Sequence, residues 1–233
     1  MARFHAMLYV LFMGNILLAQ HPSLVNPGFE GSPNHSTVPE GWIDCGFPGE
    51  SAPDVHPDNI FGVRTRPFEG NTYLGLVGRD NHTWERVGAS LSDPLQKGGC
   101  YTFSIALCRA QEYLSTSRVT YNELSYTAPV YFRLWGCEKS GVAKELLGKT
   151  GLINHTDWRK YEFLLQPLEG TYGHILLEVG FATKVAVNGN LLLDAASDFV
   201  PLADCELSED RQLIALSLEE KETPISLPAV VSG

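Results

Sequence analysis

The chain has few positive charges for its length and no basic stripe. Lys and Arg number 17 against 27 Asp and Glu, so the formal net charge is −10. Proteins gain most of their affinity for nucleic acid by neutralising phosphates with Lys and Arg. A chain with this balance is not expected to bind nucleic acid or an anionic lipid surface.

Short catalytic motifs are also missing. The sequence has no G-x-S-x-G elbow, no H-E-x-x-H pair, no phosphate-binding loop and no papain-type cysteine context. Two carboxylates that flank a sugar could hydrolyse it, and Asp80 and Glu85 are the nearest such pair by sequence. Glu85, however, has the same strand phase as Val87 and Ala89, which favours a structural acid. We therefore expect that the chain is not an enzyme.

The sequence has one long apolar run, and it lies near the start. Arg3 and His5 precede an apolar run over 6–18, which is broken only by Gly14 and Asn15 and is followed by Ala19. This pattern is typical of a secretory signal peptide, and the run is too short to span a bilayer comfortably. A retained membrane anchor is the alternative. The expected organisation is a signal peptide over 1–19, a β-sandwich binding domain over 20–203 and an acidic flexible tail over 204–233.

Apolar and polar residues alternate through most of the chain, and no window has a sustained helical period. Polar loops over 31–59 and 111–128 interrupt this pattern, and loops of such length are often functional. The expected strands cover 72–78, 84–91, 100–110, 129–136, 158–165 and 174–181, the first two forming a hairpin. The sequence therefore predicts an all-β sandwich.

Two motifs at opposite ends of this stretch resemble those of a known fold family. One is Asn-Pro-Gly-Phe-Glu over 26–30, and the other is Asn-Leu-Leu-Leu-Asp over 190–194. They are similar to the first and last strands of galactose-binding-like jelly rolls, the fold of many cellulose- and xylan-binding carbohydrate-binding modules. The resemblance covers residues 23–202 and implies an all-β jelly-roll β-sandwich.

A further resemblance is to a subgroup of secreted proteins from Bacteroidetes-type bacteria. It depends on the stretch YLGLVGRDN over 73–81, on the following Thr-Trp-Glu over 83–85, and on a leader that ends in Gln20. This resemblance implies that the protein is secreted and lies in the periplasm, at the outer membrane or on the cell surface.

Each of the two jelly-roll motifs contains one carboxylate. If the sandwich closes by pairing its first and last strands, Glu30 and Asp194 come together and repel unless a hard cation or a donor lies between them. The modules that the chain resembles commonly hold an ion between these segments, so we expect a structural calcium ion bound by Glu30, Asp194 and Asn26. The alternative is that Glu30 caps a turn and Asp194 accepts bonds from backbone amides.

The alternation on three expected strands leaves an outward face that carries aromatic and charged side chains. Aromatic rings pack on the apolar faces of pyranoses, while Arg and Glu bond the hydroxyls. The alternative is that these aromatics pack beneath the long loops and that the Arg–Glu contacts are ordinary surface contacts. The predicted ligand-binding residues are Trp84, Arg86, Tyr131, Arg133, Trp135 and Glu178.

These features together predict an exported, non-catalytic β-sandwich module that binds carbohydrate at the cell envelope or surface. The alternative is a protein-interaction module of an outer-membrane or secretion assembly, because exposed aromatic residues mark either kind of ligand. No transmembrane segment is expected once the signal peptide is removed.

The cysteines include no C-x-x-C pair, and their odd number leaves at least one thiol unpaired within the chain. If the strands over 100–110 and 129–136 are antiparallel neighbours, Cys100 and Cys137 come close enough for a disulfide. Two free buried thiols are the alternative. The five positions are Cys45, Cys100, Cys108, Cys137 and Cys205.

Overall fold

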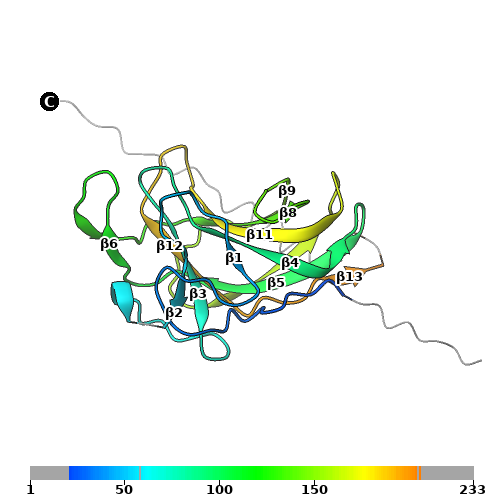
Figure 1. Ribbon diagram of the computed structural model, residues 1–233, viewed down its shortest axis with the longest axis horizontal. Coiled ribbons are helices and arrows are strands. Elements are labelled where there is room, and N and C mark those ends of the chain that lie inside the picture. The colour runs from blue at the N-terminus through cyan, green and yellow to red at the C-terminus, as the bar shows by residue number, and fades with distance from the viewer. Residues whose placement is uncertain (1–20, 58, 204, 206–233) are drawn as a thin grey trace, which may run out of the picture.

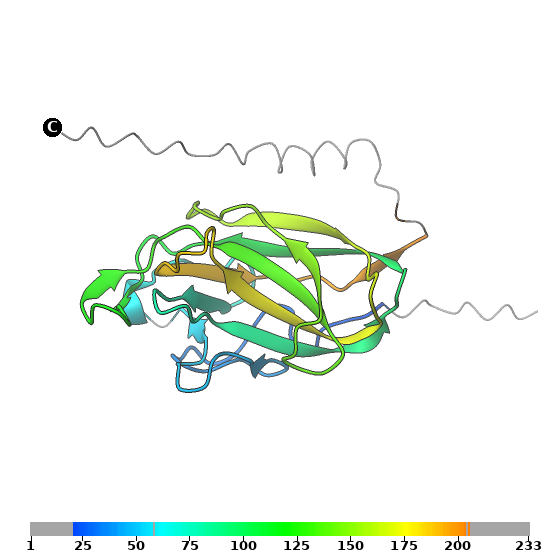
Figure 2. The ribbon, with the colours of Figure 1, turned by 90° about the horizontal axis from the view of Figure 1, so that it is seen from above.

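The computed structural model describes residues 21–57, 59–203 and 205, which form two antiparallel sheets packed face to face (Figure 1, Figure 2). The prediction of an all-β jelly-roll sandwich is confirmed. The expected signal peptide over 1–19 lies outside the described residues, as does the expected tail over 204–233 apart from Cys205. Within the described part of the chain, no helix is both long and apolar enough to cross a membrane.

One sheet has five strands, all of them antiparallel to their neighbours. Strand β11 is at its centre, between β4 and β8, so its side chains are flanked on both sides. In order across the sheet, the strands are β1 (Ile43–Asp44), β4 (Arg86–Leu95), β11 (Tyr172–Gly180), β8 (Tyr131–Cys137) and β9 (Glu145–Lys149).

The second sheet has six strands and is also antiparallel. Its members are β10 (Arg159–Leu165), β5 (Cys100–Cys108), β12 (Gly189–Asp194), β3 (Tyr73–Gly78), β2 (Asp54–His56) and, beside β5, β13 (Val200–Leu202). A separate ribbon of β6 (Leu114–Thr116) and β7 (Glu123–Ser125) projects at one end, next to the 3-10 turn η1 (Ile60–Gly62) (Figure 1, Figure 2).

Alternate side chains of both sheets fill the space between them. On β8 and just before it, Val130, Phe132 and Leu134 are fully buried, and on β4 Val87 and Ala89 are buried with them. Each large apolar side chain removed from water in this way contributes about 1.5–3 kcal/mol. The alternation that was predicted for β8 and β4 is therefore confirmed, and it assigns the intervening residues of these strands to the outer face.

The expected hairpin over 72–91 is wrong beyond its turn. The backbone N–H of Arg79 donates to the carbonyl of Thr83 at 2.9 Å, and that of Glu85 donates to the carbonyl of Val77 at 2.8 Å. After this turn β3 and β4 enter different sheets. Apolar side chains of both strands, Leu74 on β3 and Val87 on β4 among them, belong to the core between the two sheets.

The expected disulfide between Cys100 and Cys137 is also wrong. Strands β5 and β8 lie in different sheets, because the chain between them crosses from one sheet to the other and forms the β6–β7 ribbon on the way. Strand β13 runs beside β5 instead, with Leu202 opposite Cys100. This pairing brings Cys205 to Cys100, and the two form a disulfide with their Cα atoms 5.3 Å apart.

The two jelly-roll motifs do not pair as strands. β12 lies between β3 and β5, whereas the segment over 22–30 is irregular. Two prolines, Pro22 and Pro27, lack the N–H that a sheet ladder requires. Their carbonyls still accept hydrogen bonds of 2.9 Å from the amides of Phe199 and Ala196, so the first segment lies alongside the chain that follows β12.

Candidate functional site

The six predicted ligand-binding residues lie together on the outer face of the five-stranded sheet. Strand β11 positions them because its neighbours on both sides are in register with it: Glu178 is opposite Arg86 on β4 and opposite Arg133 on β8. Tyr131 is opposite Gly180, and Trp135 is opposite Leu176. Trp84 precedes β4 by two residues and therefore has the same orientation as Arg86.

One cross-strand row forms the centre of this face. Arg86, Glu178, Arg133 and Lys149 follow one another across β4, β11, β8 and β9. Side chains that are directly opposite on neighbouring strands have their Cβ atoms about 5 Å apart and interact. The row therefore places three cations and one carboxylate side by side, with Tyr131 on one flank and Trp135 on the other.

Glu178 binds three of these residues at once. Its Oε2 accepts the indole N–H of Trp84 at 2.9 Å, and its Oε1 accepts that of Trp135 at 2.8 Å. Arg133 Nη1 lies 3.3 Å from Oε1. Glu178 is only 3% exposed, so this carboxylate holds the two indoles in place. The prediction that Glu178 bonds a ligand hydroxyl is not supported by this arrangement.

The two tryptophans have different surroundings. The ring of Trp84 is packed edge-on between Phe47, with centroids 4.8 Å apart, and Phe181, at 5.8 Å. Among the described residues no other aromatic ring contacts Trp135. Both tryptophans are half-buried, but only Trp84 is flanked by aromatic rings on two sides, which leaves the ring of Trp135 as the better candidate for stacking against a ligand.

A glycine gives Arg133 its position. A Cβ atom on Gly180 would lie 2.2 Å from both Nε and Nη2 of Arg133, so the guanidinium lies directly over the bare backbone of β11. The Arg133 side chain is 26% exposed. The guanidinium of Arg133 therefore rests against the backbone of β11 on one side and is exposed to solvent on the other.

The other two cations of the row contact aromatic rings. Arg86 lies over the ring of Phe47 at 5.4 Å and donates from Nε to the carbonyl of Cys45. Lys149 Nζ lies 4.1 Å from the centre of the Tyr131 ring. Sequence reasoning missed Phe47 and Lys149, because Phe47 is in an irregular loop and no strand was expected around Lys149. Phe181, the residue after β11, also packs against Trp84.

The expected calcium ligands Glu30 and Asp194 both contact the loop before β3. Asp194 Oδ2 accepts the amides of Phe68 at 2.8 Å and Glu69 at 3.1 Å. Glu30 Oε1 accepts the amide of Asn71 at 2.9 Å. Burial raises the pKa of Asp194 to about 6, and the charge of Glu30 adds to this, although the amide bonds lower it.

Asn26, the third expected ligand, has a different role in the described structure. Its Oδ1 accepts the amide of Glu30 at 2.9 Å, and its Nδ2 donates to the carbonyls of Glu30 and Glu40 at 2.8 and 3.0 Å. The side chain therefore closes the turn that carries Glu30. In the part of the chain that the structure describes, no three His, Cys, Asp or Glu side chains are grouped so that they could hold a metal ion.

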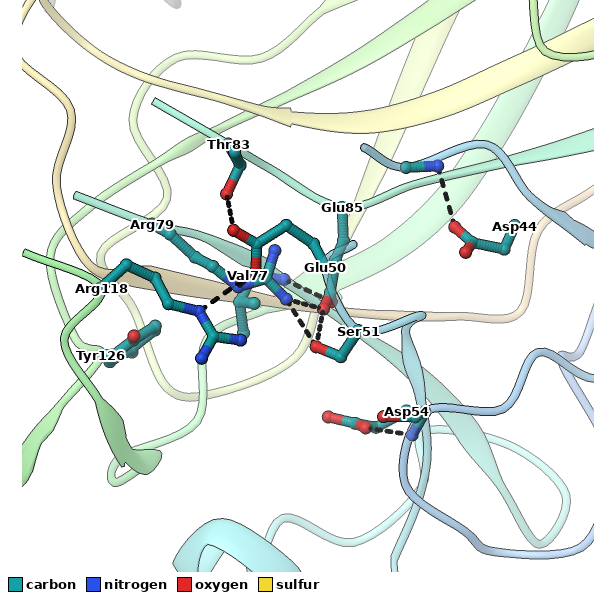
Figure 3. Close-up of polar contacts among 12 residues, drawn as sticks. Asp44, Glu50, Ser51, Asp54, Val77, Arg79, Thr83, Glu85, Arg118 and Tyr126 are labelled. Atoms are coloured by element: carbon teal, nitrogen blue, oxygen red, sulfur yellow. Dashed lines mark hydrogen bonds and ion pairs between the residues drawn. The ribbon is translucent and has the colours of Figure 1, made fainter. Parts of the chain in front are cut away.

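A second polar cluster lies at the turn between β3 and β4 (Figure 3). Arg79 lies between two acids: its Nη2 pairs with Glu85, and its Nε is 3.6 Å from Glu50. Arg118, from the loop between β6 and β7, also reaches Glu50, at 3.1 Å. Arg79 and Glu85 are buried, and burial raises the pKa of Glu85 well above its usual value. Through these contacts the loops over 31–59 and 111–128 are both attached to the turn between β3 and β4.

Asp80 and Glu85 do not form a catalytic pair in this cluster. Asp80 accepts bonds from the hydroxyl of Ser117, the amide of Arg118 and the side-chain amide of Asn188. Glu85 instead pairs with Arg79, as expected of a structural acid. A separate shallow groove of about 350 Å³ lies elsewhere and contains none of the predicted site residues; it is lined by Phe61, Gly62, Leu114, Ser115, Thr116 and Glu123.

Comparison with known proteins gives a likeness of fold. No family model and no curated protein sequence matches the chain. A cyclase from Fischerella sp. TAU in complex with 4-(1H-indol-3-yl)butan-2-one superposes with a TM-score of 0.51 at 11% identity, over 80% of this chain and 99% of that one. A second structure of a cyclase from the same source gives 0.50 at 11% identity, over 79% and 98%.

A xylan-binding domain is also among the similar structures. The CBM22-1 domain of Paenibacillus barcinonensis Xyn10C has a TM-score of 0.44 at 15% identity, over 74% of this chain and 97% of that one. These likenesses give no support to the Bacteroidetes-type resemblance. The expectation that the chain is not an enzyme is contradicted, because the fold it shares with the two cyclases is one that carries catalysis. The lack of a short catalytic motif was a poor criterion for a fold of this kind.

Proposed function

We propose that the outer face of the five-stranded sheet is a carbohydrate-binding site. The observation that supports this most directly is the carboxylate of Glu178, which accepts hydrogen bonds from the indoles of Trp84, just before β4, and of Trp135, on β8. A ring that is already fixed loses little freedom when a ligand stacks on it. The adjoining Arg133 supplies hydrogen-bond donors for a sugar.

Affinity electrophoresis in a panel of soluble polysaccharides tests this proposal. At least one polysaccharide should retard the protein, and Trp135→Ala should weaken that binding about tenfold or more. Tyr121→Ala is the control, because Tyr121 lies on the β6–β7 ribbon and is 81% exposed. If no polysaccharide binds, or if Trp135→Ala binds as well as the parent protein, the proposal is wrong.

A second candidate function is the docking of an envelope protein, and a separate surface favours it. The turn of the β6–β7 ribbon exposes Val119 at 59% and Tyr121 at 81%. Exposed apolar side chains on a projecting element often contact a partner. In a pull-down from envelope extract, Tyr121→Ala would abolish capture of such a partner, whereas Trp135→Ala would not.

We also propose that the protein is exported and that it contains structural calcium. Export is supported by the leader over 1–19, and fractionation with N-terminal sequencing of the mature protein tests it. Calcium is supported by two carboxylates, Glu30 and the buried Asp194, that contact one loop through hard oxygen atoms. Backbone carbonyls would complete the ligands, while Asn26 would hold the Glu30 turn in place.

A further inference from the structure

The central row of the site has an excess of positive charge. Arg86, Arg133 and Lys149 are aligned with a single acid, Glu178, on the same face. The formal charge of the row is therefore +2, whereas that of the whole chain is −10. Such a local excess on an acidic protein attracts an anion at close range, where the charges elsewhere are largely screened by salt.

The single acid of the row is not available to a ligand. Both oxygens of Glu178 accept indole N–H groups, and Oε1 also faces Arg133. A neutral sugar is commonly bound through both donors and acceptors, because each hydroxyl is both. The polar groups that this row offers are donors only, which matches a ligand group that only accepts hydrogen bonds.

Within the described residues, Arg86 and Lys149 form no ion pair with an acidic side chain. Arg86 pairs with a carbonyl and with the ring of Phe47, and Lys149 pairs with the ring of Tyr131. Glu178 is the only acid that contacts Arg133 in that part of the chain. A carboxylate or sulfate forms strong charge-assisted bonds with Arg, and a planar guanidinium can bind it through two donors.

We propose that the ligand of this face is an acidic saccharide, in which a carboxylate or sulfate group lies between Arg133 and Lys149 while a pyranose ring stacks on Trp135. This inference rests on the proposed carbohydrate-binding function and specifies its ligand class. It also explains the position of Gly180, since any side chain there would displace the Arg133 guanidinium.

Isothermal titration with matched pairs of oligosaccharides tests the inference: a uronic acid oligomer with its carboxyl-reduced form, and a sulfated galactan oligomer with its desulfated form. At least one acidic member should bind more than tenfold more tightly than its neutral counterpart. Lys149→Gln should weaken that binding about two- to fivefold, as expected for an exposed charge pair. Lys160→Gln, an exposed lysine on β10 of the other sheet, is the control and should change nothing.

The outcomes distinguish this inference from the proposed function. If neutral and acidic members bind equally, and Trp135→Ala weakens both, the carbohydrate site stands and the preference for acidic ligands is overturned. If acidic oligomers bind but Trp135→Ala has no effect, the binding is non-specific charge attraction, and both proposals fail. If none of the four oligomers binds, the acidic-ligand inference is overturned, and the polysaccharide panel then tests the proposed function alone.

Discussion

The carboxylate of Glu178 and the indole of Trp135 are joined by a hydrogen bond of 2.8 Å between neighbouring strands. The same carboxylate binds the indole of Trp84 at 2.9 Å and contacts Arg133 at 3.3 Å. Three residues from two separated parts of the sequence thus depend on one buried acid.

Replacing Glu178 by Leu should lower the free energy of unfolding by about 2–3 kcal/mol, because Arg133 and two indole N–H groups lose their acceptor. Urea unfolding followed by tryptophan fluorescence measures this loss. Glu162→Leu, at an exposed position of β10, is the matched control and should change stability by less than about 0.5 kcal/mol. Equal stability of the two variants would show that Glu178 does not hold the site together.

Gly180→Ala should impair binding with little loss of stability. The three heavy atoms nearest to the new Cβ would be Nε, Nη2 and Cζ of Arg133, at the far end of a flexible side chain that can move away. Binding of the best polysaccharide should therefore weaken as much as in Arg133→Ala. Gly173→Ala, on the same strand with no atom within 4 Å of its Cβ, is the control. Unchanged binding in Gly180→Ala would mean that Arg133 does not contact the ligand.

Removal of the Cys100–Cys205 disulfide should destabilise the fold. The bond closes a loop with a sequence separation of 105, and loss of a native disulfide typically costs about 2–5 kcal/mol. Cys205→Ser should show this loss in denaturant unfolding, whereas Cys45→Ser, at a half-buried free cysteine, should not. Peptide mapping without reductant should give the Cys100–Cys205 cross-link. A Cys100–Cys137 cross-link would contradict the sheet assignment of β5 and β8.

Acid should weaken the contacts of Glu145. Burial would raise its pKa, but the amides of Leu168 and Glu169 and the hydroxyl of Tyr172 hold the pKa below its usual value. A carboxyl with a lowered folded pKa stabilises the fold above its unfolded pKa, about 4.3, and this contribution is lost as the pH falls through the folded value. Melting temperatures from pH 7 to 3 should therefore fall less steeply in Glu145→Gln than in the parent. Parallel curves would contradict this account.

Calcium should raise the stability of the protein. A ligand at one hundred times its dissociation constant stabilises the folded state by about 2.7 kcal/mol. The melting temperature should therefore rise with added calcium and fall on chelation, and Glu30→Gln should abolish the difference. Glu40→Gln, at an exposed neighbouring acid, should retain it. The absence of any calcium effect on the parent protein would leave Glu30 as a turn acid that bonds Asn71 and Thr72.

The sequence by itself determined which residues of a strand face outward. Tyr131, Arg133 and Trp135 alternate with fully buried neighbours, and the pleat of any β-strand separates such residues onto opposite faces. This property is local, so it could be inferred without knowing where the strand lies. The same reasoning correctly gave the all-β class and the structural role of Glu85.

Only the tertiary structure decided which strands are neighbours and, with them, how the site is built. Backbone ladders form between almost any two strands, so the sequence did not show that β5 and β8 lie in different sheets or that Cys100 is paired with Cys205. For the same reason, the contacts of Phe47 with Trp84 and of Lys149 with Tyr131 were not predictable. These contacts depend on long-range packing. The buried area and the register between strands determine which residues meet, and the local sequence pattern does not.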